Sequence, residues 1–330
     1  MAADVDLLIL AELNPDVLVS AADVEVRFGQ VEQLIENATV TLGSSGAITA
    51  CAAAAQGLRV AVCAVTGDDP IGEWTREQLR GHGVDVTGVT ARPGRATGLS
   101  VVLTRAGGDR AILTFPGTMT ELSAADVPPG LLARARHVHA SSFFLQRGLQ
   151  ADLPALFAQA RSAGATTSLD TGWAPDGEWA AAGPVLAGLS YLLPNEAECA
   201  HLARALVPAA EPGSGPGMLA CAAALASLGP AVAVKLGAAG GLIVGSDGAF
   251  RVHGRPVEPL DTTGAGDCFN AGFLAGLLDG ELQAGALRRA VASGSAAVTG
   301  WGGTGALATR EQAERAGAEL VTDQLAIPAA

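Results

Sequence analysis

The chain of 330 residues contains a single lysine, only 4% aromatic residues and a net charge of −13. Acidic balance of this size argues against a generic basic surface, so no nucleic-acid partner is expected. Its apolar runs, of which residues 218–228 form one, are shorter than the ~20 residues that a membrane helix requires. No membrane partner is therefore expected either.

Cysteine is also scarce: there are five residues, an odd number, and no Cys-x-x-Cys pair. This usage argues against a disulfide framework or a zinc site and fits a reducing compartment. The first residues do not place a basic segment before an apolar one, so we expect no signal peptide and a cytoplasmic location.

Two common phosphate-binding motifs are missing. The lone lysine, Lys235, precedes Leu236, so the chain has no P-loop of the form Gly-x-x-x-x-Gly-Lys-Ser/Thr. Gly264-Ala265-Gly266 is followed by Asp267 and does not fit the dinucleotide-binding fingerprint. A dehydrogenase is accordingly the weakest of the functions considered.

What the chain does have is a high hydrophobic content, 49%, and a regular alternation of short apolar runs with Ala-rich helical stretches. Such an alternation predicts an α/β fold with a mostly parallel sheet covered by helices on both faces. We expect strands at 5–10, 59–64, 137–140, 167–170, 190–193, 231–236 and 242–245, and helices at 47–56, 71–80, 151–162, 179–189, 195–206, 264–278 and 282–299.

Two segments depart from this pattern. Residues 15–35 and 98–116 alternate apolar and polar side chains, as strands with one exposed face do. They predict a small sheet projecting from the main body, although two hairpins at the edge of the main sheet would give the same pattern. Residues 208–217, rich in Pro, Gly and Ser, predict a surface loop.

The most informative segment is 261–273, in which Gly264, Ala265 and Gly266 stand between two aspartates and precede an apolar run. This is the pattern of a tight turn that opens a buried helix. The first amides of a helix lack internal partners and can bind an anion, while Asp267 in the first turn could accept a proton. An ordinary glycine-rich turn with an aspartate near the helix start is the alternative.

The longer string resembles the C-terminal signature of the ribokinase family, the phosphofructokinase-B-type carbohydrate kinases. The succession of glycine motifs at 43–47, 57–61, 67–72 and 83–85 resembles the first signature of that family, and the similarity covers nearly the whole chain. It implies a ribokinase-like, doubly wound fold in one domain, residues 1–330, with a small β-sheet lid formed by about 15–40 and 95–116.

The resemblance further implies an ATP-dependent kinase that phosphorylates a hydroxymethyl group of a ribose- or fructose-like sugar. Asp267 would be the base, and Gly264, Ala265 and Gly266 would stabilise the transferred phosphoryl group. The acceptor would be bound by Asn14, Asp16, Gly43 and Ser44. Asn-Pro-Asp is also a common turn, which is the alternative for Asn14 and Asp16.

Nucleotide and metal sites follow from the same resemblance. Asn195 and Glu198 share a helix face and would organise Mg²⁺, although they also fit a capping box. Lys235, Gly237 and Gly240 would lie near the nucleotide. Asp261 and Thr263 would help to hold a monovalent cation, K⁺, together with carbonyls of 300–304, or would only bond their own turn.

The sequence leaves several matters open. A nucleoside kinase of the same family, with an adenosine-like acceptor, is the nearest rival, and a non-catalytic sugar sensor is a rival of another class. The resemblance also suggests a homodimer formed through the lid. The acceptor, the preferred phosphate donor and the oligomeric state are not specified by the residues.

Overall fold

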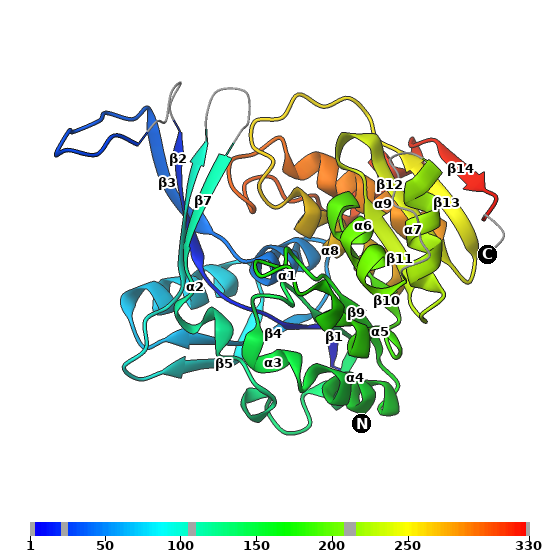
Figure 1. Ribbon diagram of the computed structural model, residues 1–330, viewed down its shortest axis with the longest axis horizontal. Coiled ribbons are helices and arrows are strands. Elements are labelled where there is room, and N and C mark those ends of the chain that lie inside the picture. The colour runs from blue at the N-terminus through cyan, green and yellow to red at the C-terminus, as the bar shows by residue number, and fades with distance from the viewer. Residues whose placement is uncertain (1–3, 21–25, 105–109, 208–215, 328–330) are drawn as a thin grey trace.

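In the computed structural model, residues 4–20, 26–104, 110–207 and 216–327 are described. Their main feature is a ten-stranded sheet, with helices on both faces and a smaller sheet standing apart from it (Figure 1). In spatial order the strands of the large sheet are β14 (Thr322–Leu325), β13 (Gly248–His253), β12 (Gly240–Gly245), β11 (Ala231–Lys235), β10 (Tyr191–Leu192), β9 (Thr166–Leu169), β8 (Ala135–Ala140), β1 (Val5–Leu10), β4 (Val60–Gly67) and β5 (Asp85–Arg92).

Neighbouring strands from β11 to β5 are parallel, whereas β12, β13 and β14 extend the sheet in antiparallel fashion. β1 is buried at all six positions because it lies in the middle of the sheet, between β8 and β4. Its sequence is apolar except for Asp6, which is typical of a parallel strand covered on both faces. The sheet therefore has the mostly parallel architecture that the sequence predicts.

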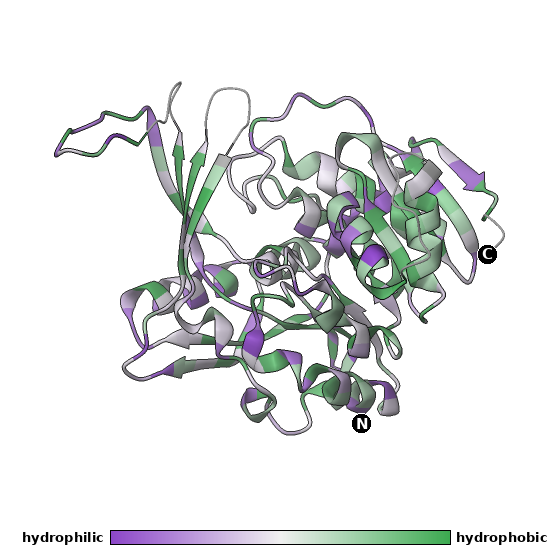
Figure 2. Ribbon diagram, in the orientation of Figure 1, coloured by the Kyte–Doolittle hydropathy of each residue, from purple (hydrophilic) through white to green (hydrophobic). Residues whose placement is uncertain are grey.

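The helices divide between the two faces of this sheet. One apolar cluster includes side chains from α4 (Leu153–Ser162), α5 (Gly183–Leu186), α6 (Glu196–Leu206) and α7 (Pro216–Ala226). The other includes side chains from α1 (Ser45–Ala55), α2 (Pro70–Gly81), α8 (Ala265–Leu278) and α9 (Gln283–Ala297). The remaining helices are α3 (Arg147–Gln150) and α10 (Arg310–Ala318). Apolar residues accordingly dominate the strands and the helix faces between the layers (Figure 2).

The smaller sheet consists of β3 (Asn37–Leu42), β2 (Pro15–Ser20), β6 (Leu99–Thr104) and β7 (Arg110–Phe115), in that order. It shares no strand with the large sheet, so the alternative of two edge hairpins is wrong. Strand structure does not continue through 26–36, contrary to the predicted alternation there, and this segment extends outward between β2 and β3 (Figure 1). Of the predicted alternation, residues 21–25 and 105–109 lie outside the described residues.

Other local predictions need correction. A single helix over 179–189 is wrong: a 3-10 turn covers 179–182 and the four-residue α5 follows it. Pro184 lies in the first turn of α5, where its missing N–H and fixed φ suit the start of a helix but not its interior. The predicted loop 208–217 lies outside the described residues up to 215, and α7 begins at Pro216.

The described helices include none that is both long enough and apolar enough to cross a bilayer.

Candidate active site

Polar side chains gather where the parallel strands end. Glu12 and Asn14 follow β1, Asp170 follows β9, Asn195 follows β10, and Lys235 closes β11. The carboxyl ends of parallel strands lie at one edge of a sheet, where α/β proteins place their ligands. β2 begins at Pro15, directly after Asn14, so the smaller sheet arises at this same edge.

Asp267 lies in the first turn of α8, whose N-cap is Gly264 in the left-handed conformation (φ 76°). A Cβ at Gly264 would lie 2.6 Å from Gly303 Cα, so this turn requires glycine for both conformation and space. The Asp267 Oδ1 atom accepts a hydrogen bond from Ser45 Oγ at 2.6 Å. Desolvation, together with the negative charge of Asp170, raises the pKa of Asp267 to about 7.

The amides at the start of α8 are only partly used within the protein. Ala265 N–H donates to Thr262 O at 3.4 Å and Asp267 N–H to Gly264 O at 3.1 Å. Within the described part of the chain, the N–H groups of Gly264 and Gly266 donate to no protein acceptor. Of the amides expected to bind an anion, those of Gly264 and Gly266 are therefore the ones available to a ligand, and both precede Asp267 at the start of α8.

Lys235 forms a buried polar cluster with Asp170 and Asn270. Its Nζ atom lies 2.6 Å from Asp170 Oδ2, which also accepts from Asn270 Nδ2 at 2.6 Å. Although burial opposes both charges, each charge stabilises the other, so the pKa of Asp170 is lowered and that of Lys235 is raised. Lys235 is therefore charged, and Asp170 links it to α8, one turn after Asp267.

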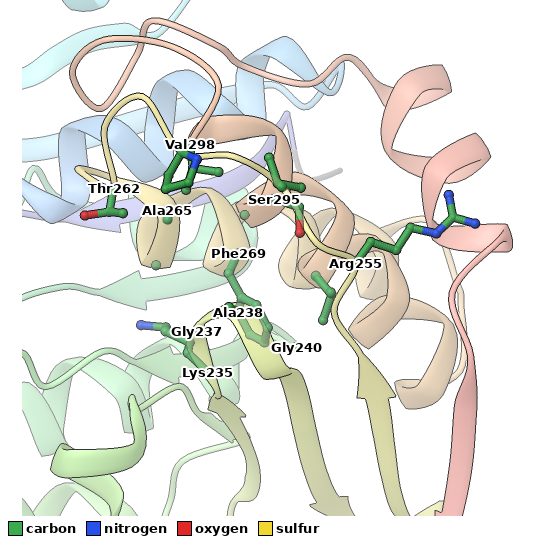
Figure 3. Close-up of a pocket in the computed structure, with 15 residues that line it drawn as sticks. Lys235, Gly237, Ala238, Gly240, Arg255, Thr262, Ala265, Phe269, Ser295 and Val298 are labelled. Carbon is green, nitrogen blue, oxygen red and sulfur yellow. The ribbon is translucent and has the colours of Figure 1, made fainter. Parts of the chain in front are cut away.

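A cleft of about 350 Å³ opens beside Lys235 and the start of α8 (Figure 3). Its lining includes the predicted residues Lys235, Gly237, Gly240, Ala265 and Gly266. In Figure 3, Lys235 and Thr262 lie at one end of the cleft and Arg255 at the other. The walls between them are mainly apolar, formed by Ala238, Val257, Pro259, Phe269, Val291 and Val298. The charge of Lys235 at one end and the apolar walls beyond it fit a nucleotide with its phosphates at Lys235 and its base between the apolar side chains. Arg255 at the other end is paired with Glu319.

This placement makes a prediction for Gly266. A Cβ at this position would lie 3.4 Å from Lys235 Cδ, an ordinary contact, so Gly266→Ala should be tolerated. Gly266→Val places a branched side chain against Lys235 and next to the Gly266 amide, so it should raise the KM for ATP by about tenfold or more, the value of one charge-assisted hydrogen bond. Steady-state kinetics of the two variants test this, and equal KM values for wild type and Gly266→Val would contradict an anion site here.

Asn195 and Glu198 form the capping box at the start of α6. Glu198 N–H donates to Asn195 Oδ1 at 2.9 Å, and Glu198 Oε2 accepts from Asn195 N–H at 2.9 Å. Burial, followed by the charge of Asp170, raises the pKa of Glu198 to about 7. Across the described ranges no cluster of three His, Cys, Asp or Glu side chains could hold a metal. A Mg²⁺ that takes its ligands from nucleotide phosphates and water, with Glu198 nearby, is compatible with this arrangement.

Asp261 and Thr263 are joined within their own turn. Asp261 Oδ1 accepts from the amide and the hydroxyl of Thr263 at 2.9 and 2.7 Å, and Oδ2 accepts from Gly302 N–H at 2.8 Å. These bonds bring the 261–263 turn against the loop 300–304, as the resemblance implies. A monovalent cation held by the carbonyls of this junction stays a prediction.

The expected acceptor residues lie together at the base of the smaller sheet. Asn14 Nδ2 donates to Asp16 Oδ1 at 2.9 Å, and a Cβ at Gly43 would lie 2.7 Å from Asn14 Nδ2. Gly43 therefore leaves room that any side chain would fill. The hydroxyl of Ser44 donates to Glu12 O at 2.5 Å and accepts from Ala47 N–H at 3.0 Å, which caps α1.

Four polar residues of this region were not predicted from the sequence: Glu12, Ser45, Asp170 and Asn270. Glu12 and Asp170 follow buried strands, and this position is a signal that could have identified them. Ser45 and Asn270 have no comparable signal, because their roles depend on contacts with Asp267 and Asp170, 222 and 100 residues away.

Comparison with known proteins agrees with this geometry. A family model described as pfkB family carbohydrate kinase matches residues 9–310. The ribokinase of Haemophilus influenzae is 26% identical over 280 residues, which cover 84% of this chain and 87% of the relative. The ATP-dependent ribose-1-phosphate kinase of Halopiger xanaduensis is 30% identical over 244 residues, covering 73% and 75%.

Among solved structures, the Arabidopsis thaliana ribokinase complexed with ribose and ATP superimposes with a TM-score of 0.79. The match covers 96% of this chain and 99% of the neighbour at 22% identity. At this identity the likeness shows the fold, and the ribokinase-like fold implied by the motifs is confirmed.

Proposed function

Because the chain belongs to the pfkB family of carbohydrate kinases, and is thus an ATP-dependent phosphotransferase, we propose that it phosphorylates a hydroxymethyl group of a small ribose- or fructose-like sugar. One observation carries the proposal. The carboxylate of Asp267 lies in the first turn of α8, next to the amides of Gly264 and Gly266 and beside the cleft that Lys235 lines. The proposed base thus lies close to two kinds of group that can bind phosphate, the backbone amides and the lysine ammonium.

In this mechanism Asp267 accepts the proton of the acceptor hydroxyl as the phosphoryl group moves. Lys235 and the amides of Gly264 and Gly266 offset the charge on the phosphoryl oxygens. Mg²⁺, organised through Asn195 and Glu198, would neutralise charge on the nucleotide phosphates when bound. Asp16 and Asn14 would hold the acceptor. The carboxylate of Asp16 can accept hydrogen bonds from two hydroxyl groups at once. Positioning and electrostatics account for most of phosphoryl-transfer catalysis.

Two other functions are compatible with this fold. A nucleoside kinase would use the same base and the same cleft and would differ only in the acceptor. A non-catalytic sugar sensor would retain the fold, but it would have no need of Asp267 beside anion-binding amides. A coupled assay of ADP release over ribose, fructose, other ketoses and nucleosides separates the three functions. The absence of ADP release with every one of these acceptors would favour the sensor.

The smaller sheet is proposed to act as a lid, because it begins at the acceptor residues Asn14 and Asp16. Closure over the acceptor would exclude water and protect the phosphoryl group from hydrolysis. We expect acceptor binding to slow hydrogen exchange in β2, β3, β6 and β7, and to leave the central strand β1 unaffected. If a verified substrate binds and these four strands exchange as before, the assignment as a lid is wrong.

The lid also supplies a surface for a homodimer. Val40 on the edge strand β3 and Ile112, Leu113 and Phe115 on the edge strand β7 are each more than half exposed. Ile112 and Leu113 are consecutive and point to opposite faces of the sheet, so neither face is covered there. Exposed apolar side chains on two edge strands favour pairing with a second copy. Sedimentation should show a dimer that Leu113→Asp weakens, and a monomeric wild type would contradict this.

A further inference from the structure

Resting on the proposed function, we propose that Ser45 is a positioning residue that orients the carboxylate of Asp267, and that buried Glu12 holds Ser45 in place. Neither residue is among those predicted from the sequence. Ser45 begins α1, the helix that follows β3, and Glu12 lies just after the end of β1. The start of α1 contacts the first turn of α8 through Ser45 and Asp267.

The contact with the base is direct. Ser45 is the first residue of α1, and its hydroxyl donates to Asp267 Oδ1 at 2.6 Å. One carboxylate oxygen is thereby fixed, which leaves Oδ2 to accept a proton from the acceptor. A second residue of the same helix, Thr49, donates from its hydroxyl to the backbone carbonyl of Asp267 at 3.3 Å. α1 therefore holds both the side chain and the backbone of the base.

Glu12 fixes the position of the Ser45 backbone. Its Oε1 accepts from Ser45 N–H at 3.0 Å and from Ser142 Oγ at 2.8 Å, and its Oε2 accepts from Ser141 Oγ at 3.1 Å. The hydroxyl of Ser44 donates to the backbone carbonyl of Glu12 at 2.5 Å. The buried carboxylate thus joins the loop after β8 to the loop before α1.

The conformations of the two loops show that these bonds are needed. Ser44 and Ser142 are both in the left-handed region, with φ values of 65° and 47°. Residues other than glycine adopt this region at a cost and persist there only when their surroundings hold them. Gly46 follows closely, and a Cβ there would lie 2.6 Å from Ser141 Oγ, so the loop has little space in which to shift. Glu12 is the group that the two strained serines share.

The electrostatic setting makes the Ser45 contact measurable. Desolvation and the charges of Asp170 and Glu12 all favour the protonated form of Asp267, whereas the Ser45 hydroxyl and the ammonium of Lys235 favour the carboxylate. Burial raises the pKa of Glu12 as well. Loss of the Ser45 hydroxyl should therefore raise the pKa of Asp267 and reduce the fraction of active base at neutral pH.

The test compares Ser45→Ala, Ser45→Thr and Thr49→Val over the pH range. In Ser45→Ala the acid limb of the kcat profile should move up by about one pH unit, the value of one hydrogen bond to a charged group. Turnover at pH 6 then falls about tenfold, while turnover at pH 9.5 stays within about twofold of wild type. Ser45→Thr, which keeps the hydroxyl, should restore the limb. Thr49→Val removes a hydroxyl that touches only the backbone of Asp267, so it should leave the limb in place.

A uniform loss of turnover at every pH in Ser45→Ala, or a shifted limb in Thr49→Val, would mean that α1 has only a structural role and would overturn the proposal. Glu12→Asp keeps the negative charge that acts on Asp267 but shortens the side chain that holds Ser45 N–H, so it should lower turnover at pH 6 as Ser45→Ala does. A second readout does not depend on turnover: carboxyl ¹³C NMR of the free protein, with the Asp267 signal assigned by its absence in Asp267→Asn. If the Asp267 carboxyl titrates alike in wild type and Ser45→Ala, the inference fails. If it shifts as expected but no acceptor is phosphorylated, the proposed function fails instead.

Discussion

Replacing Asp267 by asparagine is expected to lower turnover by roughly 10²–10⁴-fold while leaving ATP affinity and fold close to those of wild type. A primary alcohol is a weak acid, so its proton must pass to a base within hydrogen-bond reach as the phosphoryl group is transferred. Asparagine keeps the size of the side chain and can still accept a hydrogen bond from the hydroxyl of Ser45, but it cannot take up the proton of the acceptor alcohol.

The same variant separates the base from the simpler interpretation of Asp267 as part of a glycine-rich turn. Asparagine suits a helix start about as well as aspartate does, so that interpretation predicts nearly unchanged turnover. Measurements of kcat and of ATP binding by calorimetry, with a thermal melt to verify the fold, distinguish the two. If Asp267 is the base, as we propose, its carboxylate form is lost as the pH falls below about 7, so kcat of the wild type should decline there.

Lys235→Met is expected to have the second large effect, on both turnover and stability. Turnover should fall about 10²–10³-fold, because the variant loses the fixed positive charge that we propose faces the phosphoryl oxygens. The variant also leaves the buried carboxylate of Asp170 without its ion pair, which costs roughly 3–5 kcal/mol of folding free energy. Urea unfolding and steady-state kinetics measure the two effects separately.

The double variant Asp170→Asn Lys235→Met provides the control. It removes both charges, and the new amide oxygen at position 170 could still accept from Asn270, so most of the folding free energy should return. Turnover should stay low, because the charge near the phosphate site is still absent. If turnover returned together with stability, Lys235 would be a structural residue only, and the phosphate end of the cleft would have to be placed elsewhere.

The parts of the fold that could be predicted are those whose sequence depends on burial alone. β1 was predicted at its observed bounds, because a strand covered on both faces is almost entirely apolar, here with Asp6 as the one polar residue. β13 and β14 were not predicted. β13, Gly-Ala-Phe-Arg-Val-His, is buried at only two of its six positions and its apolar residues neither form a continuous run nor alternate. β14, Thr-Asp-Gln-Leu, is buried at no position and has one apolar residue. Strands of this kind are specified mainly by the neighbour with which they pair.

The site residues that could be predicted are likewise those whose requirements are local. The turn before α8 could be identified because its requirements are local: Gly264 for its φ and its space, and Asp267 in the following helical turn. Ser45 could not be identified, because an isolated serine at a helix start is an ordinary capping residue. Its significance arises only when folding brings α1 against α8, and no local pattern encodes that contact.

The most direct test of the central claim is ³¹P NMR of a reaction mixture containing the protein, MgATP and the acceptor that scores highest in the ADP-release assay. Transfer to a hydroxymethyl group predicts a new phosphomonoester signal that splits into a triplet through coupling to two protons, together with ADP. This signal should be absent with Asp267→Asn at the same protein concentration and reaction time. A doublet would place the phosphate on a secondary hydroxyl, and inorganic phosphate alone would mean hydrolysis of ATP; either result would contradict the account.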